Sequence, residues 1–116
     1  MIEPKISIIT VSYNAVSTIE ETILSVIKQS YVNIEYIIID GGSTDGTLDI
    51  IKKYQSKISY WVSEHDNGIY DAMNKGIRMS TGDIVGIINS DDFYHRRDII
   101  SRVVEAFRNE RTQAVY

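Results

Sequence analysis

The chain has 116 residues, the size of a single domain, and its 43% hydrophobic and 24% charged content is that of a folded globular protein. It has no cysteine, which excludes disulfide frameworks, zinc–thiolate sites, iron–sulfur clusters and cysteine nucleophiles. The net charge of −4 leaves no strongly basic surface for nucleic acid, and no apolar run reaches the ~18 residues of a membrane span. The N-terminus lacks a signal-peptide pattern, so the expected location is the cytoplasm.

Apolar runs of strand length alternate along the chain with amphipathic stretches of helix length. In chain order we expect a strand at Ile6–Val11, a helix at Thr18–Gln29, a strand at Ile34–Ile39, a helix at Thr47–Tyr54, a strand at Ile58–Val62, a helix at Gly68–Met79, a strand at Ile84–Ile88, a helix at Asp98–Phe107 and the start of a strand at Ala114. This alternation predicts an α/β fold with a mostly parallel sheet and helices on both faces. The loops that follow the strands then share one edge, where open α/β sheets bind ligands.

Polar side chains gather directly after three of the expected strands. These clusters are Thr10, Ser12, Tyr13 and Asn14; Asp40 to Thr47; and Asn89 to Asp92. Asp40 closes a wholly apolar strand, and an unpaired acid there is costly, so we expect it to accept hydrogen bonds from a nucleobase N–H or from ribose hydroxyls. The glycines and hydroxyls after Asp40 are typical of a turn that caps the next helix. In a parallel sheet the three clusters form a single pocket.

Asp91 and Asp92 are adjacent at the end of a buried strand. Two carboxylates ~4 Å apart repel by roughly 4 kcal/mol at an effective dielectric of about 20. A divalent cation relieves that repulsion, and ligands that are all oxygen favour Mg²⁺ or Mn²⁺. The same pair is also typical of a helix cap or turn before Phe93, so both interpretations stay open. His65 and His95 lack partners at ligand spacing and are expected to be loop residues.

Taken in order, these segments resemble the N-terminal half of a family 2 glycosyltransferase. The matching segments are Ile8–Asn14 with the family's first strand and loop, Asp40–Thr47 with its second motif, Glu64–Ile77 with a long signature of one bacterial branch, Thr81–Asp83 before the last strand, and Asn89–Asp92 with its D-x-D element. The resemblance covers Lys5 to Tyr116. Asn89 departs from the commoner first acid, and His65 stands where this branch often has proline.

The resemblance implies a truncated GT-A fold (nucleotide-diphospho-sugar transferase, Rossmann-like), with residues 1–116 the N-terminal part of one glycosyltransferase family 2 domain. The implied activity is inverting, metal-dependent transfer of a sugar from a nucleotide-diphosphate-sugar donor to a hydroxyl of a saccharide or lipid-linked acceptor. The implied setting is bacterial cell-surface polysaccharide synthesis in the cytoplasm, including peripheral association with the inner face of the membrane. The implied cofactor is Mn²⁺ or Mg²⁺.

The resemblance also implies a set of donor-binding residues: Thr10, Ser12, Asn14, Asp40, Asp66, Lys75, Asp91 and Asp92. Thr10 and Asp40 would hold the base and ribose. Asp91 and Asp92 would lie at the metal, with Asp91 favoured because Asn89-Ser90-Asp91 aligns with D-x-D.

Lys75 would add positive charge at the diphosphate; the alternative is a solvated helix lysine that pairs with Asp71 four residues earlier. The catalytic base is expected beyond Tyr116, so this fragment alone should not turn over. The unpaired strand edge expected at Ala114 favours a homodimer.

Two other functions stay open. A nucleotidyltransferase also binds nucleotides on an α/β sheet, but the absence of any glycine between Met1 and Asp40 speaks against its usual phosphate loop. P-loop and dinucleotide fingerprints are likewise missing. The second alternative is a nucleotide-binding module without turnover. Nucleotide titrations with and without manganese, followed by a donor-hydrolysis assay, separate these functions.

Overall fold

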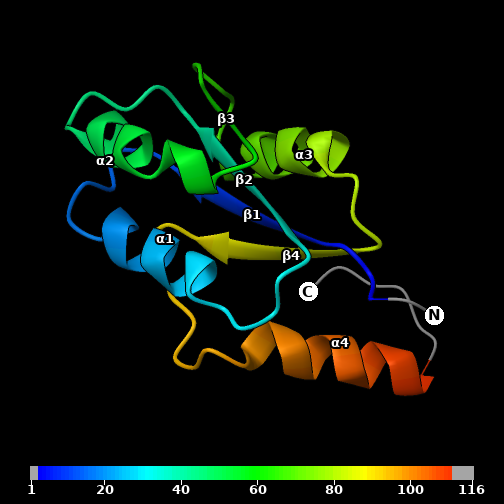
Figure 1. The fold of residues 1–116 in the computed structure, drawn as a ribbon. Coiled ribbons are helices and arrows are strands. Elements are labelled where there is room, and N and C mark those ends of the chain that lie inside the picture. Colours follow the sequence, from blue (N-terminus) through cyan, green and yellow to red (C-terminus); the bar gives the residue numbers. More distant parts are fainter. Residues whose placement is uncertain (1–2, 111–116) are drawn as a thin grey trace.

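The computed structural model describes residues 3–110 (Figure 1). Its elements are β1 (Ile6–Ser12), α1 (Ile19–Ile27), β2 (Ile34–Asp40), α2 (Thr47–Lys53), the short 3₁₀ helix η1 (Gln55–Lys57), β3 (Tyr60–Ser63), α3 (Ile69–Met79), β4 (Ile84–Asn89) and α4 (Ile99–Glu110). The predicted alternation of strands and helices is confirmed over this range. The strand expected from Ala114 lies outside the described residues.

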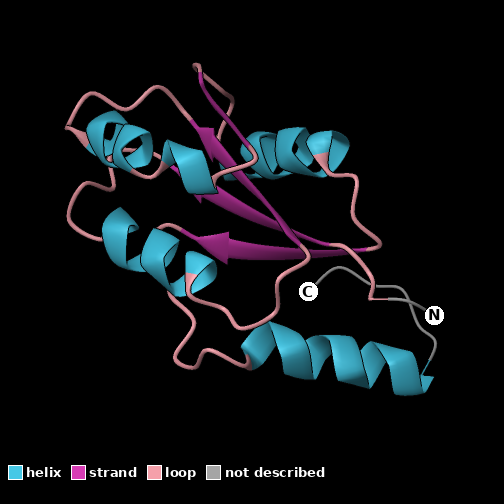
Figure 2. Ribbon diagram, in the orientation of Figure 1, coloured by secondary structure: helices cyan, strands magenta, loops and turns pink. Residues whose placement is uncertain are grey.

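Within residues 3–110 the strands form one parallel sheet in the order β3-β2-β1-β4. β1 is central: Ile6 pairs with Ile34 of β2 and with Ile84 of β4. Because every strand runs in the same direction, all the strands end at the same edge, as the arrowheads in Figure 2 show. The predicted parallel sheet is therefore confirmed, and its carboxyl edge is where the polar clusters meet.

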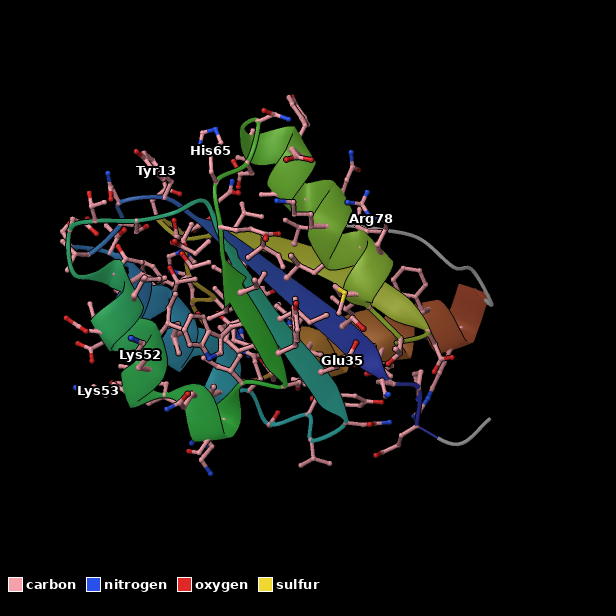
Figure 3. The ribbon with its side chains drawn as sticks, turned by 90° about the horizontal axis from the view of Figure 1, so that it is seen from above. Tyr13, Glu35, Lys52, Lys53, His65 and Arg78 are labelled. Carbon is pink, nitrogen blue, oxygen red and sulfur yellow. The ribbon has the colours of Figure 1, made fainter. Side chains whose placement is uncertain are left out.

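Helices cover both faces of the sheet, as predicted (Figure 3). Side chains alternate along β1, so that Ile6 and Ile8 pack in the larger core with α1, α2 and α4, whereas Ile9 and Val11 pack in the smaller core with α3. All four side chains are almost completely buried. β-Branched side chains on both faces suit a strand that is covered on both sides, which is why the sequence of β1 reads as a continuous apolar run.

α3 approaches β1 closely because it carries a glycine at the contact. A Cβ atom built on Gly76 would lie 2.5 Å from Cγ2 of Ile9, closer than side chains pack. Gly76 is itself buried. The glycine thus fixes how near α3 lies to the sheet, and with it the position of the loop that leads into α3.

Most element boundaries differ from the sequence-based prediction by a residue or more, and two of these differences have a clear structural reason. β3 begins at Tyr60 and not at Ile58, because the preceding residues form η1 and the Ile58 N–H closes that turn on the Gln55 carbonyl at 3.2 Å. α1 ends at Ile27 and not at Gln29. The Gln29 side chain instead donates to the Arg96 carbonyl at 2.6 Å and ties the end of α1 to the segment before α4.

No helix among the described residues combines the length and the apolar character needed to cross a bilayer.

Candidate functional site

The Asp40 carboxylate lies at the end of β2 and is fully buried. Its Oδ1 accepts hydrogen bonds from the hydroxyls of Ser12 at 2.7 Å and Ser43 at 2.6 Å. Its Oδ2 accepts from the Ser63 hydroxyl at 2.8 Å and from the backbone N–H groups of Gly42 at 3.0 Å and Ser43 at 2.8 Å. Five donors thus surround one carboxylate, and they come from the ends of β1 and β3 as well as from its own loop.

These hydrogen bonds decide the charge state of Asp40. Burial by itself would raise the pKa of this carboxyl group, but the hydrogen bonds from Ser43, Ser12 and Ser63 favour the ionised form and outweigh it, so that the pKa is lowered. At neutral pH an ionised Asp40 therefore holds the carboxyl ends of three neighbouring segments together.

The loops after β1 and β2 are fastened to each other by further hydrogen bonds. The backbone N–H of Asn14 donates to Ser43 Oγ at 2.8 Å, and the Asn14 side chain accepts from the Thr44 N–H at 2.9 Å. Asn14 has a φ of 46°, a left-handed conformation that asparagine tolerates better than most residues. Asp45 accepts from the Thr47 N–H at 3.0 Å in the first turn of α2, as the predicted turn requires. These hydrogen bonds hold the two loops together at the carboxyl edge of the sheet.

The cluster after β4 forms a turn held on α1. The Asp92 N–H donates to the Asn89 carbonyl at 3.0 Å, and the buried Thr22 hydroxyl donates to the carbonyls of Ser90 at 3.0 Å and of Asp92. Asp92 Oδ1 accepts from the Phe93 N–H at 2.8 Å. The turn before Phe93, one of the two interpretations of the sequence, is therefore present, and it leaves the Asp91 side chain exposed.

The loop between β3 and α3 carries Asp66 and leads to Lys75. Asp66 Oδ1 accepts from the Gly68 N–H at 3.0 Å, at a glycine whose φ of 109° favours the absence of a side chain. The Lys75 ammonium lies 3.3 Å from Glu64 Oε1 and 3.8 Å from Asp71 Oδ2. The i,i+4 pair between Asp71 and Lys75, which the sequence offered as the alternative to a role at the diphosphate, is thus present, and Glu64 adds a second carboxylate.

A cavity of about 640 Å³ opens at this edge of the sheet. Its lining comes from the ends of β1 and β4, the loop after β2 and the start of α3: Val11, Ser12, Tyr13, Asn14, Ala15, Ser17, Thr18, Gly41, His65, Asp66, Gly68, Ile69, Ala72, Asn89, Ser90 and Asp91. Figure 3 shows Tyr13 and His65 at the same end of the molecule, opposite Glu35 near the start of β2. A volume of this size is typical of a small-molecule site.

The cavity brings together four of the eight residues predicted for donor binding: Ser12, Asn14, Asp66 and Asp91. The other four lie outside its lining. Thr10 is buried and hydrogen-bonded to the Tyr36 hydroxyl at 2.8 Å, and Asp40 is fully buried and hydrogen-bonded to Ser12, which lines the cavity. Lys75 is held in its ion pairs, and Asp92 is occupied in the turn before Phe93.

Several lining residues were not among the predicted site residues. Tyr13 belongs to the polar cluster that the sequence places after β1, and this position could have indicated that it lines the site. His65 was expected to be a loop residue, and it is an exposed one. Ile69 and Ala72 belong to α3, and no pattern in the sequence shows which side of α3 faces the loop after β1.

The oxygen atoms that the protein offers near Asp91 fit a magnesium-like cation that also binds a diphosphate. Within residues 3–110 no three His, Cys, Asp or Glu side chains converge as a complete protein-only ligand set. Asp91 offers a carboxylate at the cavity, beside the oxygen-bearing residues Asn89 and Ser90. Mg²⁺ usually binds through one or two carboxylates, retained water and substrate phosphates, so a single exposed acid with amide and hydroxyl neighbours is sufficient on the protein side.

Comparison with curated sequences identifies relatives of this chain. The sequence model of one family, Glycosyl transferase family 2, matches residues 7–116. An uncharacterized glycosyltransferase of Mycobacterium tuberculosis is 39% identical over 104 residues, which cover 89% of this chain and 40% of that protein. The putative teichuronic acid biosynthesis glycosyltransferase TuaG of Bacillus subtilis is 38% identical over 115 residues, covering 97% of this chain and 45% of TuaG. The chain thus spans less than half the length of these relatives.

Solved structures of similar fold support the same relationship. S. aureus TarS residues 1–349, in complex with UDP-GlcNAc, superposes with a TM-score of 0.82 and 28% identity over 91% of this chain and 31% of that 1–349 chain. A mannosyltransferase of Pyrobaculum calidifontis, in complex with GDP-Man and Mn²⁺, has a TM-score of 0.83 and 28% identity over 90% of this chain and 32% of the enzyme. The match of family, sequence and GT-A fold across nearly the whole chain shows that it belongs to glycosyl transferase family 2.

Proposed function

We propose that this chain is the N-terminal, donor-binding part of one glycosyltransferase domain that transfers a sugar from a nucleotide-diphosphate-sugar to an acceptor hydroxyl. The observation that carries the proposal is the cavity at the carboxyl edge, whose lining includes the carboxylates of Asp66 and Asp91. The complexes of TarS with UDP-GlcNAc and of the mannosyltransferase with GDP-Man support a nucleotide sugar as the donor.

The reaction is proposed to depend on Mn²⁺ or Mg²⁺ held by Asp91, with Asp92 as the adjacent acid. When bound, such a cation offsets the negative charge that grows on the departing diphosphate. Asn89 and Ser90, from the turn fastened by Thr22, orient the donor beside Asp91. The Asp40 network keeps the ends of β1, β2 and β3 in fixed positions, so that the donor meets a preorganised surface.

The remaining features of the proposal concern the whole protein. We expect inversion at the anomeric carbon, an acceptor that is a saccharide or a lipid-linked sugar, and action in cell-surface polysaccharide synthesis at the cytoplasmic face of the membrane. The name of TuaG supports the polysaccharide setting. Proton NMR of the product reports the anomeric configuration, and light scattering tests the expected homodimer.

Calorimetric titration of the 116-residue chain with UDP and GDP, each with and without Mn²⁺, tests the donor site. We expect Mn²⁺ to strengthen binding of at least one diphosphate, and Asp91→Asn to weaken the Mn²⁺-dependent binding tenfold or more, about 1.4 kcal/mol. Asp92→Asn tests separately whether Asp92, the acid held in the turn, also contributes to Mn²⁺-dependent binding. Asp49→Asn, an exposed acid on α2 outside the cavity lining, is the matched control and should leave binding unchanged. Equal affinity with and without metal in the parent chain would contradict the proposal.

A further inference from the structure

The segment that joins β4 to α4 is held in place by polar side chains of α1 (Figure 1). None of residues 90–98, all of which the structure describes, belongs to a helix or strand, so their backbone groups need other partners. Thr22 and Ser25, three residues apart on α1, supply several of these partners, and Gln29 continues them just beyond the end of the helix. We call these three residues the polar face of α1.

Thr22 and Ser25 bind the part of the segment nearest to β4. The Thr22 hydroxyl, on a side chain that is fully buried, donates to the carbonyls of Ser90 at 3.0 Å and of Asp92. Ser25 Oγ accepts from the Tyr94 N–H at 3.0 Å. The first turns of the segment are therefore fixed by hydroxyl groups of a helix and not by pairing with another strand.

Gln29 binds the part of the segment nearest to α4. Its side-chain amide donates to the Arg96 carbonyl at 2.6 Å and accepts from the Ile100 N–H at 3.0 Å. The polar face of α1 thus holds the segment from its beginning to the first turn of α4.

Asp91 stands between the two carbonyls that Thr22 binds. Because Ser90 and Asp92 flank it in the chain, one buried hydroxyl fixes the backbone on both sides of Asp91. α1 is itself fixed, since its buried side chains pack in the larger core. The Asp91 side chain stays exposed at the cavity, whereas Thr22 is not among the lining residues.

We propose that Thr22 is a positioning residue of the cation site, which acts through Asp91 and is assisted by Ser25; this inference rests on the proposed function. Without the Thr22 hydroxyl the two carbonyls lose their donor and the turn is free to move. Asp91 must then be ordered each time a cation binds, which weakens binding. Groups that orient a metal ligand typically change metal affinity about 10–100-fold when they are removed.

Thr22→Val tests this assignment because it removes the hydroxyl and keeps the branched shape of the side chain. The measured quantity is the affinity for UDP or GDP, whichever binds more tightly, in Mn²⁺ divided by the affinity in EDTA. Unfolded protein lowers the stoichiometry of a calorimetric titration and leaves this ratio unchanged. We expect the ratio to fall about tenfold in Thr22→Val, with less than a twofold change of the affinity in EDTA. Thr22→Ser, which retains the hydroxyl, should keep the ratio of the parent within twofold.

Thr81→Val is the matched control, because it makes the same substitution at the opposite end of β4. The Thr81 hydroxyl donates to Glu35 Oε2 at 2.8 Å, so this variant also loses a hydrogen bond between side chains distant in the sequence. It should keep the ratio of the parent.

A double variant tests whether Thr22 acts through Asp91. In the Asp91→Asn background, Thr22→Val should lower the ratio by less than twofold, because the ligand that it positions is already gone. Ser25→Ala, at a half-buried site, is the second variant should circular dichroism show that Thr22→Val does not fold. It leaves the Tyr94 N–H without its acceptor and should lower the ratio at least threefold.

Three results would overturn the inference. The first is a folded Thr22→Val with the ratio of the parent or, if that variant does not fold, a Ser25→Ala with the ratio of the parent. The second is an equal fall of the ratio in Thr81→Val. The third is an undiminished effect of Thr22→Val in the Asp91→Asn background. In each case a parent ratio of tenfold or more would leave the proposed function standing. A parent ratio near one would overturn the proposed cation dependence and this inference with it.

Discussion

The Asp40 carboxylate joins three segments that are far apart in the sequence, since it accepts hydrogen bonds from Ser12, Ser43 and Ser63. Asp40→Ala removes the acceptor for five donors, and each buried unsatisfied donor costs about 1–3 kcal/mol unless water replaces the carboxylate. We expect a loss of about 3 kcal/mol or more in the free energy of unfolding, measured by urea titration. Glu105→Ala, an exposed site on α4, is the control and should change stability by less than about 0.5 kcal/mol. If Asp40→Ala lowers the free energy of unfolding no more than Glu105→Ala does, the hydrogen bonds of Asp40 contribute nothing to stability.

The lowered pKa of Asp40 makes this contribution depend on pH. Its pKa in the folded state lies below the unfolded value of about 3.9, so the folded state gains stability from the ionised group above that pH and loses it as pH falls through the folded-state pKa. Asp40→Asn cannot be protonated and should show a shallower loss of stability below pH ~4. Urea midpoints measured from pH 6 downward check this. Glu35 and Asp45, whose pKa values are also lowered, contribute equally to the parent and to Asp40→Asn. Parallel curves of stability against pH for the two proteins would therefore contradict a pH-dependent contribution from Asp40.

For single residues, the sequence predicts where a residue lies along a strand or loop better than it predicts which side chains that residue contacts. The polar clusters after β1, β2 and β4 were placed correctly at the carboxyl ends of these strands, although each strand runs one residue further than predicted, to Ser12, Asp40 and Asn89. That Asp40 would be buried among three serines was not visible, since Ser63 belongs to a strand with no polar motif of its own. Asp66 could be placed in a motif, but only the packing of its loop over Gly41 shows that it covers the end of β2.

The packing of α3 on β1 depends on a glycine in the middle of a helix. Gly76→Ala improves helix propensity by about 1 kcal/mol, but the new methyl group would lie 2.5 Å from Cγ2 of the buried Ile9. Overpacking costs about 1–3 kcal/mol, so we expect a net destabilisation of about 1 kcal/mol, measured by urea unfolding. The loss in Gly76→Ala/Ile9→Ala should be smaller than the sum of the single losses by about 1 kcal/mol, because Ile9→Ala removes the clashing group.

Gly68→Ala is the matched control for this packing effect. No atom lies within 4 Å of a Cβ built on Gly68, but its φ is +109°, so alanine there strains the backbone without touching a neighbour. We expect its loss of stability to add to that of Ile9→Ala with no coupling. A coupling as large as that of Gly76→Ala would mean that the measured energy does not report the contact between α3 and β1.

Elements and their order were more predictable than their ends. Hydrophobic spacing was enough to indicate every α-helix and strand among the described residues, because each buries one face or two, but it did not indicate the 3₁₀ helix η1, which buries no residue. The start of β3 was wrong, since Ile58 is apolar and buried but belongs to the end of a 3₁₀ turn. Apolar character marks burial, and only backbone pairing decides where the strand begins.

The shape of the whole molecule explains why the cavity lies where it does. The connections from β1 to β2 and from β2 to β3 place α1 and α2 on one face of the sheet, whereas the connection from β3 back to β4 places α3 on the other. The loops after β1 and β4 therefore lead to α1 and α4 on one face, whereas the loop after β3 leads to α3 on the other, and the cavity opens between these two sets of loops at the carboxyl edge. Val11, Ser12 and Asn89 line the cavity at this point. The strand order had to come from the structure, because alternation alone does not fix it.

The same arrangement predicts that residues 1–116 bind a donor but do not transfer its sugar. An acceptor hydroxyl needs a base within roughly 3 Å in the reactive complex. The carboxylates that line the cavity are Asp66 and Asp91, and both are assigned to the donor, while Asp40 is buried and fully hydrogen-bonded. Calorimetry should show metal-dependent diphosphate binding, and incubation with a sugar donor and acceptor should give no glycoside by mass spectrometry. Transfer at a rate that Asp91→Asn abolishes would contradict this prediction and direct the search for the base to Glu64, Asp66 and Asp71.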